Sequence, residues 1–164
     1  MNEIHKKISL LYIISNDAVL MRKFNHQGYE VLDVFNVEDT DAIETGIRNK
    51  TISLFGKTFP YAYYGKIEST INKQDAVVHI DINAYRVLLN ESPAILNSYA
   101  DDVVKSGDQV IWLHKQEIAG ETRIREGDKK ILERIFKDKN IDIKIVEDQG
   151  EKWIDAKTVN YEDG

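Results

Sequence analysis

The chain has 164 residues, of which 42% are hydrophobic and 30% charged, and its formal net charge at pH 7 is −6. This length and composition are typical of a globular protein with a single domain, residues 1–164. The absence of cysteine excludes disulfides, thiolate metal sites and a cysteine nucleophile. The negative net charge argues against general binding of nucleic acids, because neutralising their phosphates needs clustered lysine and arginine. The apolar run near the N-terminus is too short to span a bilayer, so we expect no membrane partner and a cytoplasmic location.

The first predicted elements alternate between strands and helices. Residues 8–15 are almost continuously apolar, which is typical of a strand buried on both faces. Asp17 follows as the predicted cap of a helix that ends near Gly28. Residues 29–35 alternate between polar and apolar, which indicates a second strand nearer an edge. The acidic segment 36–49 predicts a short helix with a solvated outer face.

An aromatic hairpin is predicted next. Residues 51–55 and 58–63 resemble two short strands around a Gly56-Lys57 turn, so we expect a hairpin inserted at about 51–65. Ile67 and Ile71, four positions apart, suit a short helix after it.

The stretch from Asp75 to Asn90 is the centre of the prediction. Residues 76–80 form a β-branched apolar run, typical of a buried parallel strand, and residues 84–89 return to a helical spacing. His79 lies inside the run and is predicted to be a core histidine. The run ends at Asp81, and ligands of open α/β sheets lie beyond the carboxyl ends of the strands. Asp81 is therefore the first candidate for a functional residue.

The last part of the chain continues the same alternation. The expected elements are a helix over 92–107, a buried strand over 109–114, a helix over 128–139, a strand over 141–146, an edge strand at 153–154 and a frayed tail over 160–164. Alternating strands and helices predict a three-layer α/β sandwich with a mostly parallel central sheet and an inserted β-hairpin.

Acidic side chains and a histidine gather at the predicted strand ends. Candidates for catalysis are Asp81, Asp17 and His114. A magnesium-dependent nuclease or phosphoesterase needs carboxylates that converge on the metal, and its candidate ligands are Asp17, Asp39 and Asp81. Aspartates also commonly cap helices, which is the plainer role for Asp17 and Asp81.

Two groups of residues resemble the guanylate kinase family. Tyr64-Gly65, a predicted short helix and then the run from Val77 to Asn83 are similar to the middle of that family. Trp112-Leu113-His114 with the arginines beyond it is similar to its later strand and lid. The resemblance implies a nucleotide-kinase-like domain whose ligand contacts are Tyr64, Asp81, Asn83, Arg123, Arg125 and Arg134. The phosphate-binding loop is missing at Ser15-Asn16-Asp17, so the resemblance implies a nucleotide- or protein-binding module instead of a phosphotransferase.

Three functions therefore remain open: the kinase-like binding module, the magnesium-dependent hydrolase, and a non-catalytic interaction protein that uses the aromatic hairpin. Arg123 and Arg125 share their loop with Glu117, Glu121 and Glu126, so ordinary surface ion pairing competes with phosphate binding as their role.

Overall fold

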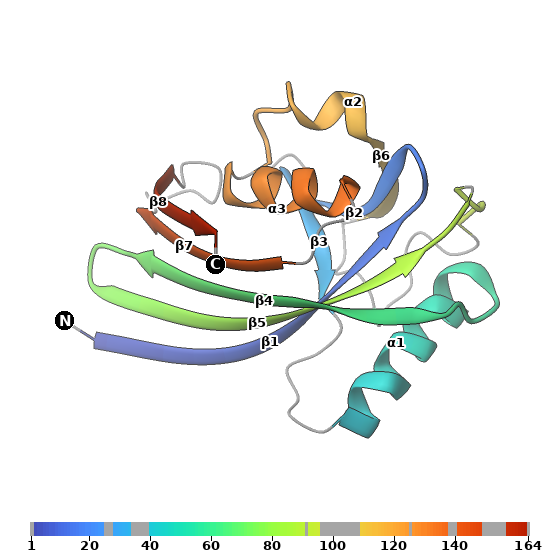
Figure 1. Ribbon diagram of the computed structural model, residues 1–164, viewed down its shortest axis with the longest axis horizontal. Coiled ribbons are helices and arrows are strands. Elements are labelled where there is room, and N and C mark those ends of the chain that lie inside the picture. Colours follow the sequence, from blue (N-terminus) through green and yellow to red (C-terminus); the bar gives the residue numbers. More distant parts are fainter. Residues whose placement is uncertain are drawn as a thin grey trace.

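The computed structural model describes residues 2–24, 28–33, 40–90, 92–95, 109–124, 126–137, 141–148 and 157–163. Its strands are β1 (Asn2–Ile14), β2 (Ala18–Phe24), β3 (Gly28–Asp33), β4 (Tyr61–Asn72), β5 (Ala76–Leu88), β6 (Gln109–His114), β7 (Ile141–Asp148) and β8 (Lys157–Asp163). Its helices are α1 (Thr40–Phe55), α2 (Lys115–Ile118) and α3 (Glu126–Phe136) (Figure 1).

The strands form one mixed sheet in the order β6-β2-β3-β1-β5-β4-β7-β8. Two neighbouring pairs, β1 with β5 and β4 with β7, are parallel. The other pairings are antiparallel. The prediction of a mostly parallel sheet is therefore wrong. Short turns join β1 to β2 and β4 to β5, and strands joined by so few residues can only pair antiparallel.

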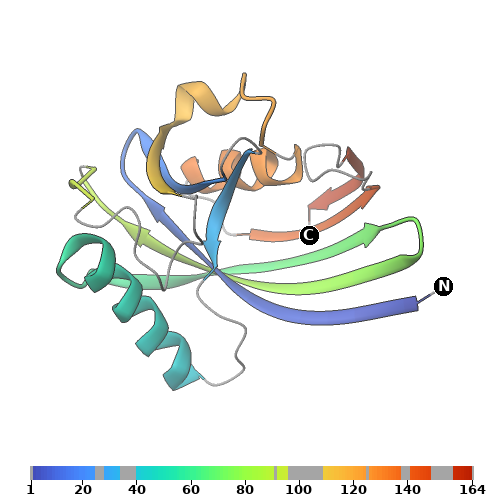
Figure 2. The same cartoon turned by 180° about the vertical axis from the view of Figure 1, so that it is seen from behind.

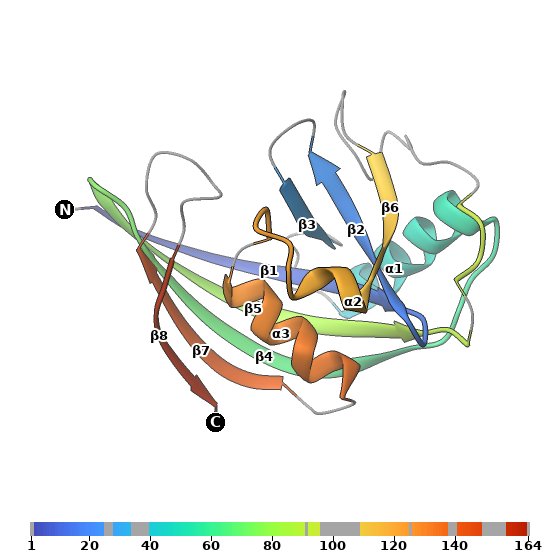
Figure 3. The same cartoon turned by 90° about the horizontal axis from the view of Figure 1, so that it is seen from above.

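Helices lie on both faces of this sheet, so the predicted α/β layering is confirmed. Helix α1 lies on one face, and α2 and α3 lie on the other (Figures 1 and 2). Seen from above, α3 crosses in front of the long strands β5 and β4, and the shorter strands β3, β2 and β6 lie to one side of it (Figure 3). Alternate residues of β1 serve the two cores: Tyr12 and Ile14 pack on the α3 side, and Leu11 and Ile13 pack on the α1 side.

The helix predicted after Asp17 is wrong, because residues 18–24 form strand β2 in a tight hairpin with β1. Val19 and Met21 are buried in the α3-side core, and Leu20 is buried in the α1-side core. A strand covered on both faces has no polar face and so no period of two for the sequence to show.

The predicted hairpin at 51–65 is also wrong, since residues 51–55 are the last turn of α1. The Thr51 hydroxyl donates to the Ile47 carbonyl oxygen at 3.1 Å, one helical turn back. The hairpin of this region is instead β4–β5. Ile67 and Ile71 face the core from β4 and not from a helix, because a spacing of four residues fits both periods.

Strand β5 continues to Leu88, so the helix predicted over 84–89 is wrong and Asp81 lies in mid-strand. Residues 92–95 are not helical, and the rest of the helix predicted there lies outside the described residues. The predicted edge strand at 153–154 lies outside them too, while the tail predicted to fray pairs as β8 with β7.

Predictions for the regular elements with a strong period are confirmed. Strands β6 and β7 and helix α3 stand where they are expected, with the apolar stripe of α3 buried through Ile131, Leu132 and Ile135. No helix among the described residues combines the length and the apolarity needed to cross a bilayer.

Candidate functional site

Asp81 lies on an open, polar face of the sheet and not at its rim. It is exposed in mid-β5, with Lys7 of β1 and Glu68 of β4 as its register neighbours. Glu68 in turn forms an ion pair of 3.8 Å with Lys144 of β7. Across these four neighbouring strands two acidic residues therefore lie between two lysines, and each carboxylate has a lysine on its outer side, which balances the charge of this solvated sheet face.

The candidate metal ligands Asp17 and Asp81 do not converge. Leu88 pairs with Ile14, close to Asp17, and it lies seven residues beyond Asp81, which is about 23 Å of strand. Asp17 lies instead beside the end of β6, where its carbonyl oxygen accepts a 2.8 Å hydrogen bond from the Lys115 amide. Two catalytic candidates, Asp17 and His114, are therefore neighbours, because Ala18 pairs with His114. Asp39 lies outside the described residues.

Tyr64 belongs to the core. Its hydroxyl oxygen accepts a hydrogen bond from the buried guanidinium of Arg86, which also lies over the Tyr64 ring at 4.1 Å. Arg86 donates a second hydrogen bond to the carbonyl oxygen of Ile135, near the end of α3. Tyr64 and Arg86 are 8% and 5% exposed, so this pair joins β4 and β5 to α3 and offers little surface to a ligand.

Arg123 is engaged by Glu121. Two of its guanidinium nitrogens, Nε and Nη2, donate to the carboxylate at 2.8 and 3.1 Å, and the Arg123 amide adds a third bond of 3.0 Å. These hydrogen bonds lower the pKa of Glu121 and raise that of Arg123. Arg123 also donates to the Tyr29 hydroxyl at 3.2 Å. Arg125 lies outside the described residues, and Arg134 is half-buried on α3.

The sequence prediction did not identify an open pocket of about 440 Å³ beside α1. Its lining comes from one face of the helix and from the segment that enters β4: Glu44, Ile47, Arg48, Thr58, Phe59, Pro60 and Tyr61. Arg48 and Glu44 form an exposed ion pair of 3.3 Å. Lys57 lies 5.2 Å from the centre of the Phe59 ring. The lining of the pocket thus combines two aromatic rings with the guanidinium of Arg48 and the carboxylate of Glu44.

Aromatic side chains continue from this pocket along the hairpin. Tyr61 and Tyr63 each meet the ring of Tyr85 edge to face, with ring centres 6.1 and 5.5 Å apart. The Tyr63 hydroxyl donates to the Asn83 side-chain oxygen at 3.2 Å. Burial and the two neighbouring phenols raise the pKa of Tyr85. The predicted aromatic surface therefore exists, although β4 and β5 carry it.

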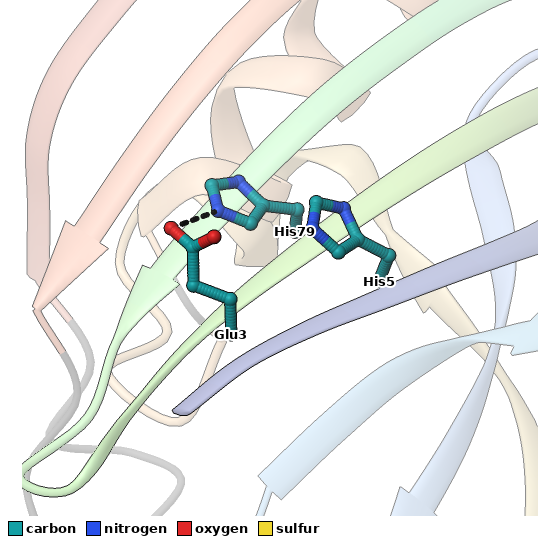
Figure 4. A group of neighbouring side chains, drawn as sticks. All are labelled: Glu3, His5 and His79. Carbon is teal, nitrogen blue, oxygen red and sulfur yellow. Dashed lines mark ion pairs between the residues drawn. The ribbon is translucent and has the colours of Figure 1, made fainter. Parts of the chain in front are cut away.

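Among the described residues, one group of at least three potential metal ligands lies within reach of one ion: Glu3, His5 and His79 (Figure 4). His79 is not the predicted core histidine, since its side chain is 36% exposed on the open face. His5 and His79 are direct register partners in the parallel pair β1–β5. The strand predicted over 8–15 begins three residues after His5, so the sequence prediction missed both the start of β1 and the register that brings the two rings together.

The sequence matches no protein-family model, and no curated protein matches it.

Solved structures do resemble it. The MutT protein from Bacillus halodurans has a TM-score of 0.67 and 14% identity, with 96% of each chain covered. The Escherichia coli ORF135 protein has a TM-score of 0.51 and 12% identity over 82% of this chain and 91% of that one. A NUDIX hydrolase from Nitrosomonas europaea has a TM-score of 0.49 and 12% identity over 82% and 90%.

The first two of these likenesses overturn the guanylate kinase resemblance, and with it the kinase-like binding module inferred from that resemblance. The motifs that suggested it have other causes here, since Tyr64 packs in the core and Asp81 lies in mid-strand. The chain has the fold of the MutT protein from Bacillus halodurans.

Proposed function

We propose that this protein recognises a small ligand of the nucleotide class in the pocket between α1 and residues 58–61. A volume of about 440 Å³ is within the range of small-molecule sites. The observation that carries the proposal is the pairing of ring faces with a guanidinium at one opening: Phe59 and Tyr61 suit a planar base, and Arg48 suits a phosphate.

Arg48 can reach a phosphate at little cost. Its ion pair with Glu44 is exposed on both sides, with 53% of each side chain accessible, and such pairs contribute little stability. A phosphate accepts two parallel bonds from a guanidinium and can displace the carboxylate. Lys57 beside Phe59 adds a second positive charge at the same opening.

Divalent-metal hydrolysis of a phosphate ester or anhydride is the second candidate, and the likeness to MutT favours it. Magnesium requires several oxygen ligands around one ion. Between Ala42 and Phe55, helix α1 has Glu44 as its single acidic residue, alongside Arg48 and Lys50. The side chains described beside the pocket therefore do not fit a magnesium site, and recognition is the proposal that their chemistry supports.

Titration calorimetry with nucleoside mono-, di- and triphosphates tests the proposal, with inorganic phosphate as a separate arm. We expect Arg48→Gln to weaken nucleotide binding at least tenfold. Lys137→Gln is the matched control, since Lys137 forms an exposed pair of 3.2 Å with Glu133 at the same i,i+4 spacing. Arg123→Gln tests the alternative phosphate contact and is expected to bind like the parent protein.

The outcomes separate the candidates. Binding that needs Arg48 and proceeds without release of phosphate supports recognition. Phosphate release that requires Mg²⁺ or Mn²⁺ would replace it with the hydrolase. Two results would rule out the pocket as the binding site: no heat of binding at millimolar nucleotide, or an equal loss of nucleotide affinity in the Arg48 and Lys137 variants.

A further inference from the structure

We propose that Glu3, His5 and His79 form a binding site for a transition-metal dication such as Zn²⁺. The site stands on the open face of the sheet where β1 begins. Along β1, His5 lies six residues before Leu11, which is about 20 Å of strand. Leu11 pairs with Tyr85, and both pack in the core beside α1. The metal site is therefore separate from the ligand pocket proposed above and does not depend on it.

The three side chains already converge. Their potential ligand atoms all lie within 4.8 Å of one another. The Nε2 atom of His79 is 3.7 Å from Oε1 of Glu3, as the dashed line in Figure 4 marks. A tetrahedral zinc ion with bonds of about 2.1 Å holds its ligands about 3.4 Å apart. Closing the site thus shortens the separations between ligand atoms by about 1.4 Å or less.

Backbone pairing supplies most of this organisation. His5 and His79 face each other across the parallel strands, and Glu3 lies two residues before His5 on the same face. The two rings are stacked, with centres 4.8 Å apart and planes 16° apart. A metal ion must lie in the plane of each imidazole, so binding turns the exposed His5 ring away from this stack.

Thr70 of β4 positions the ring of His79. Its hydroxyl lies 3.4 Å from Nδ1, on the side of the ring away from Glu3. When Nδ1–H donates to this hydroxyl, the lone pair of Nε2 is left to the metal. An outer hydrogen bond of this kind, which fixes the tautomer of a ligating histidine, is a regular feature of metal sites.

The donor set selects the class of metal. Two imidazoles and one carboxylate suit zinc, nickel or copper, whereas magnesium prefers a shell of oxygen atoms. Lys7 and Asp81 are the next register pair on this face, and because their charges are opposite, their electrostatic effects on a bound cation largely offset each other. Three protein ligands leave the fourth tetrahedral position to water.

A bound ion would join two strands that are far apart in the sequence. Between Asn2 and Lys7, β1 pairs with β5 alone among the described strands. Bonds from Glu3 and His5 on β1 to the same ion as His79 on β5 would hold this first half of β1 in place. Metal binding should therefore raise the melting temperature and slow amide exchange from Asn2 to Lys7.

The test is calorimetric titration of tag-free protein with ZnCl₂, with MgCl₂ as a second arm. We expect one zinc per chain, no heat from magnesium, and at least a tenfold loss of affinity in Glu3→Gln, His5→Gln and His79→Gln. His114→Gln is the control, since His114 is also an exposed strand histidine. These side chains are exposed or half-buried, so the variants should fold, and circular dichroism checks that they do.

A second measurement uses the unaltered protein. In nitrogen-15 spectra of the imidazoles, zinc should shift the ring nitrogens of His5 and His79 and leave those of His114 in place. Zinc heats that are unchanged by His5→Gln and His79→Gln would overturn the proposal. So would zinc-induced shifts confined to the other histidines, or no heat at millimolar zinc.

Discussion

Replacing Gly65 by alanine should destabilise the protein strongly. Gly65 follows the irregularity in β4 and pairs with Ala84 on one side and with Ile141 of β7 on the other. Its φ is +139°, and a Cβ added there would lie 1.8 Å from the carbonyl oxygen of Ile141. Carbon and oxygen atoms approach to about 3.3 Å, so the strands must separate by about 1.5 Å.

The magnitude follows from two costs. A side chain held at positive φ costs about 1–3 kcal/mol. Separating β4 from β7 at this point loses one or two backbone hydrogen bonds, at about 1 kcal/mol each. Together they lower the free energy of unfolding by about 2–5 kcal/mol, which corresponds to a fall in Tm of roughly 4–20 °C for a chain of this size.

Urea denaturation followed by circular dichroism measures this loss. Gly120→Ala is the matched control, because a Cβ at Gly120 meets nothing within 4 Å, and it should change stability by less than about 0.5 kcal/mol. A loss below about 1 kcal/mol in Gly65→Ala, with the control unchanged, would refute the close approach of β4 and β7.

Three further substitutions test the interior and one surface pair. The buried Tyr12 hydroxyl has no hydrogen-bond partner among the described residues, so Tyr12→Phe should raise the free energy of unfolding by about 1 kcal/mol in urea denaturation. Burial raises the pKa of Tyr12, so this variant should also lose less stability than the parent above about pH 10, where only the unfolded phenol ionises. Tyr64→Phe removes the hydroxyl that accepts a hydrogen bond from Arg86, so it should lower the free energy of unfolding by about 1.5–3 kcal/mol. Nucleotide affinity measured by calorimetry should not change, and a weaker affinity would show that Tyr64 belongs to the ligand site. Because Arg123 lowers the pKa of Glu121, Glu121→Gln should lower Tm near neutral pH, and the Tm difference should be smaller at about pH 3, because protonation of the parent's carboxylate removes this stabilisation as the pH falls. Equal Tm differences at both pH values would refute that pairing.

An element with one buried and one solvated face is the easier kind to predict from the sequence. Helix α3 is such a case, since Ile131, Leu132 and Ile135 recur at helical spacing among charged residues. Strand β2 is the opposite case, because Val19, Leu20 and Met21 are buried on both faces and leave no period. The sequence analysis therefore predicted a helix after Asp17, where the structure has strand β2.

The candidate site was harder to predict than the fold class, because it depends on register. The sequence analysis predicted a strand end at Asp81 because the residues change there from apolar to polar. In the structure this change is the ordinary alternation of buried and exposed residues along β5, one of whose faces is open to solvent. His5 and His79 meet only through the parallel register of β1 and β5, which no local pattern reveals. The pocket at Arg48 likewise required knowing that α1 extends to Phe55.

The parallel pairing of β1 with β5 has a consequence for synthesis of the chain. As residues emerge from the ribosome, β1, β2 and β3 can pair with one another early, but residues 2–7 must wait for β5, more than seventy positions later. During that delay their backbone groups are open to other nascent chains. Lys6 and Lys7 lie within this waiting segment, and lysines there discourage strands of neighbouring chains from adding to it before its proper partner arrives.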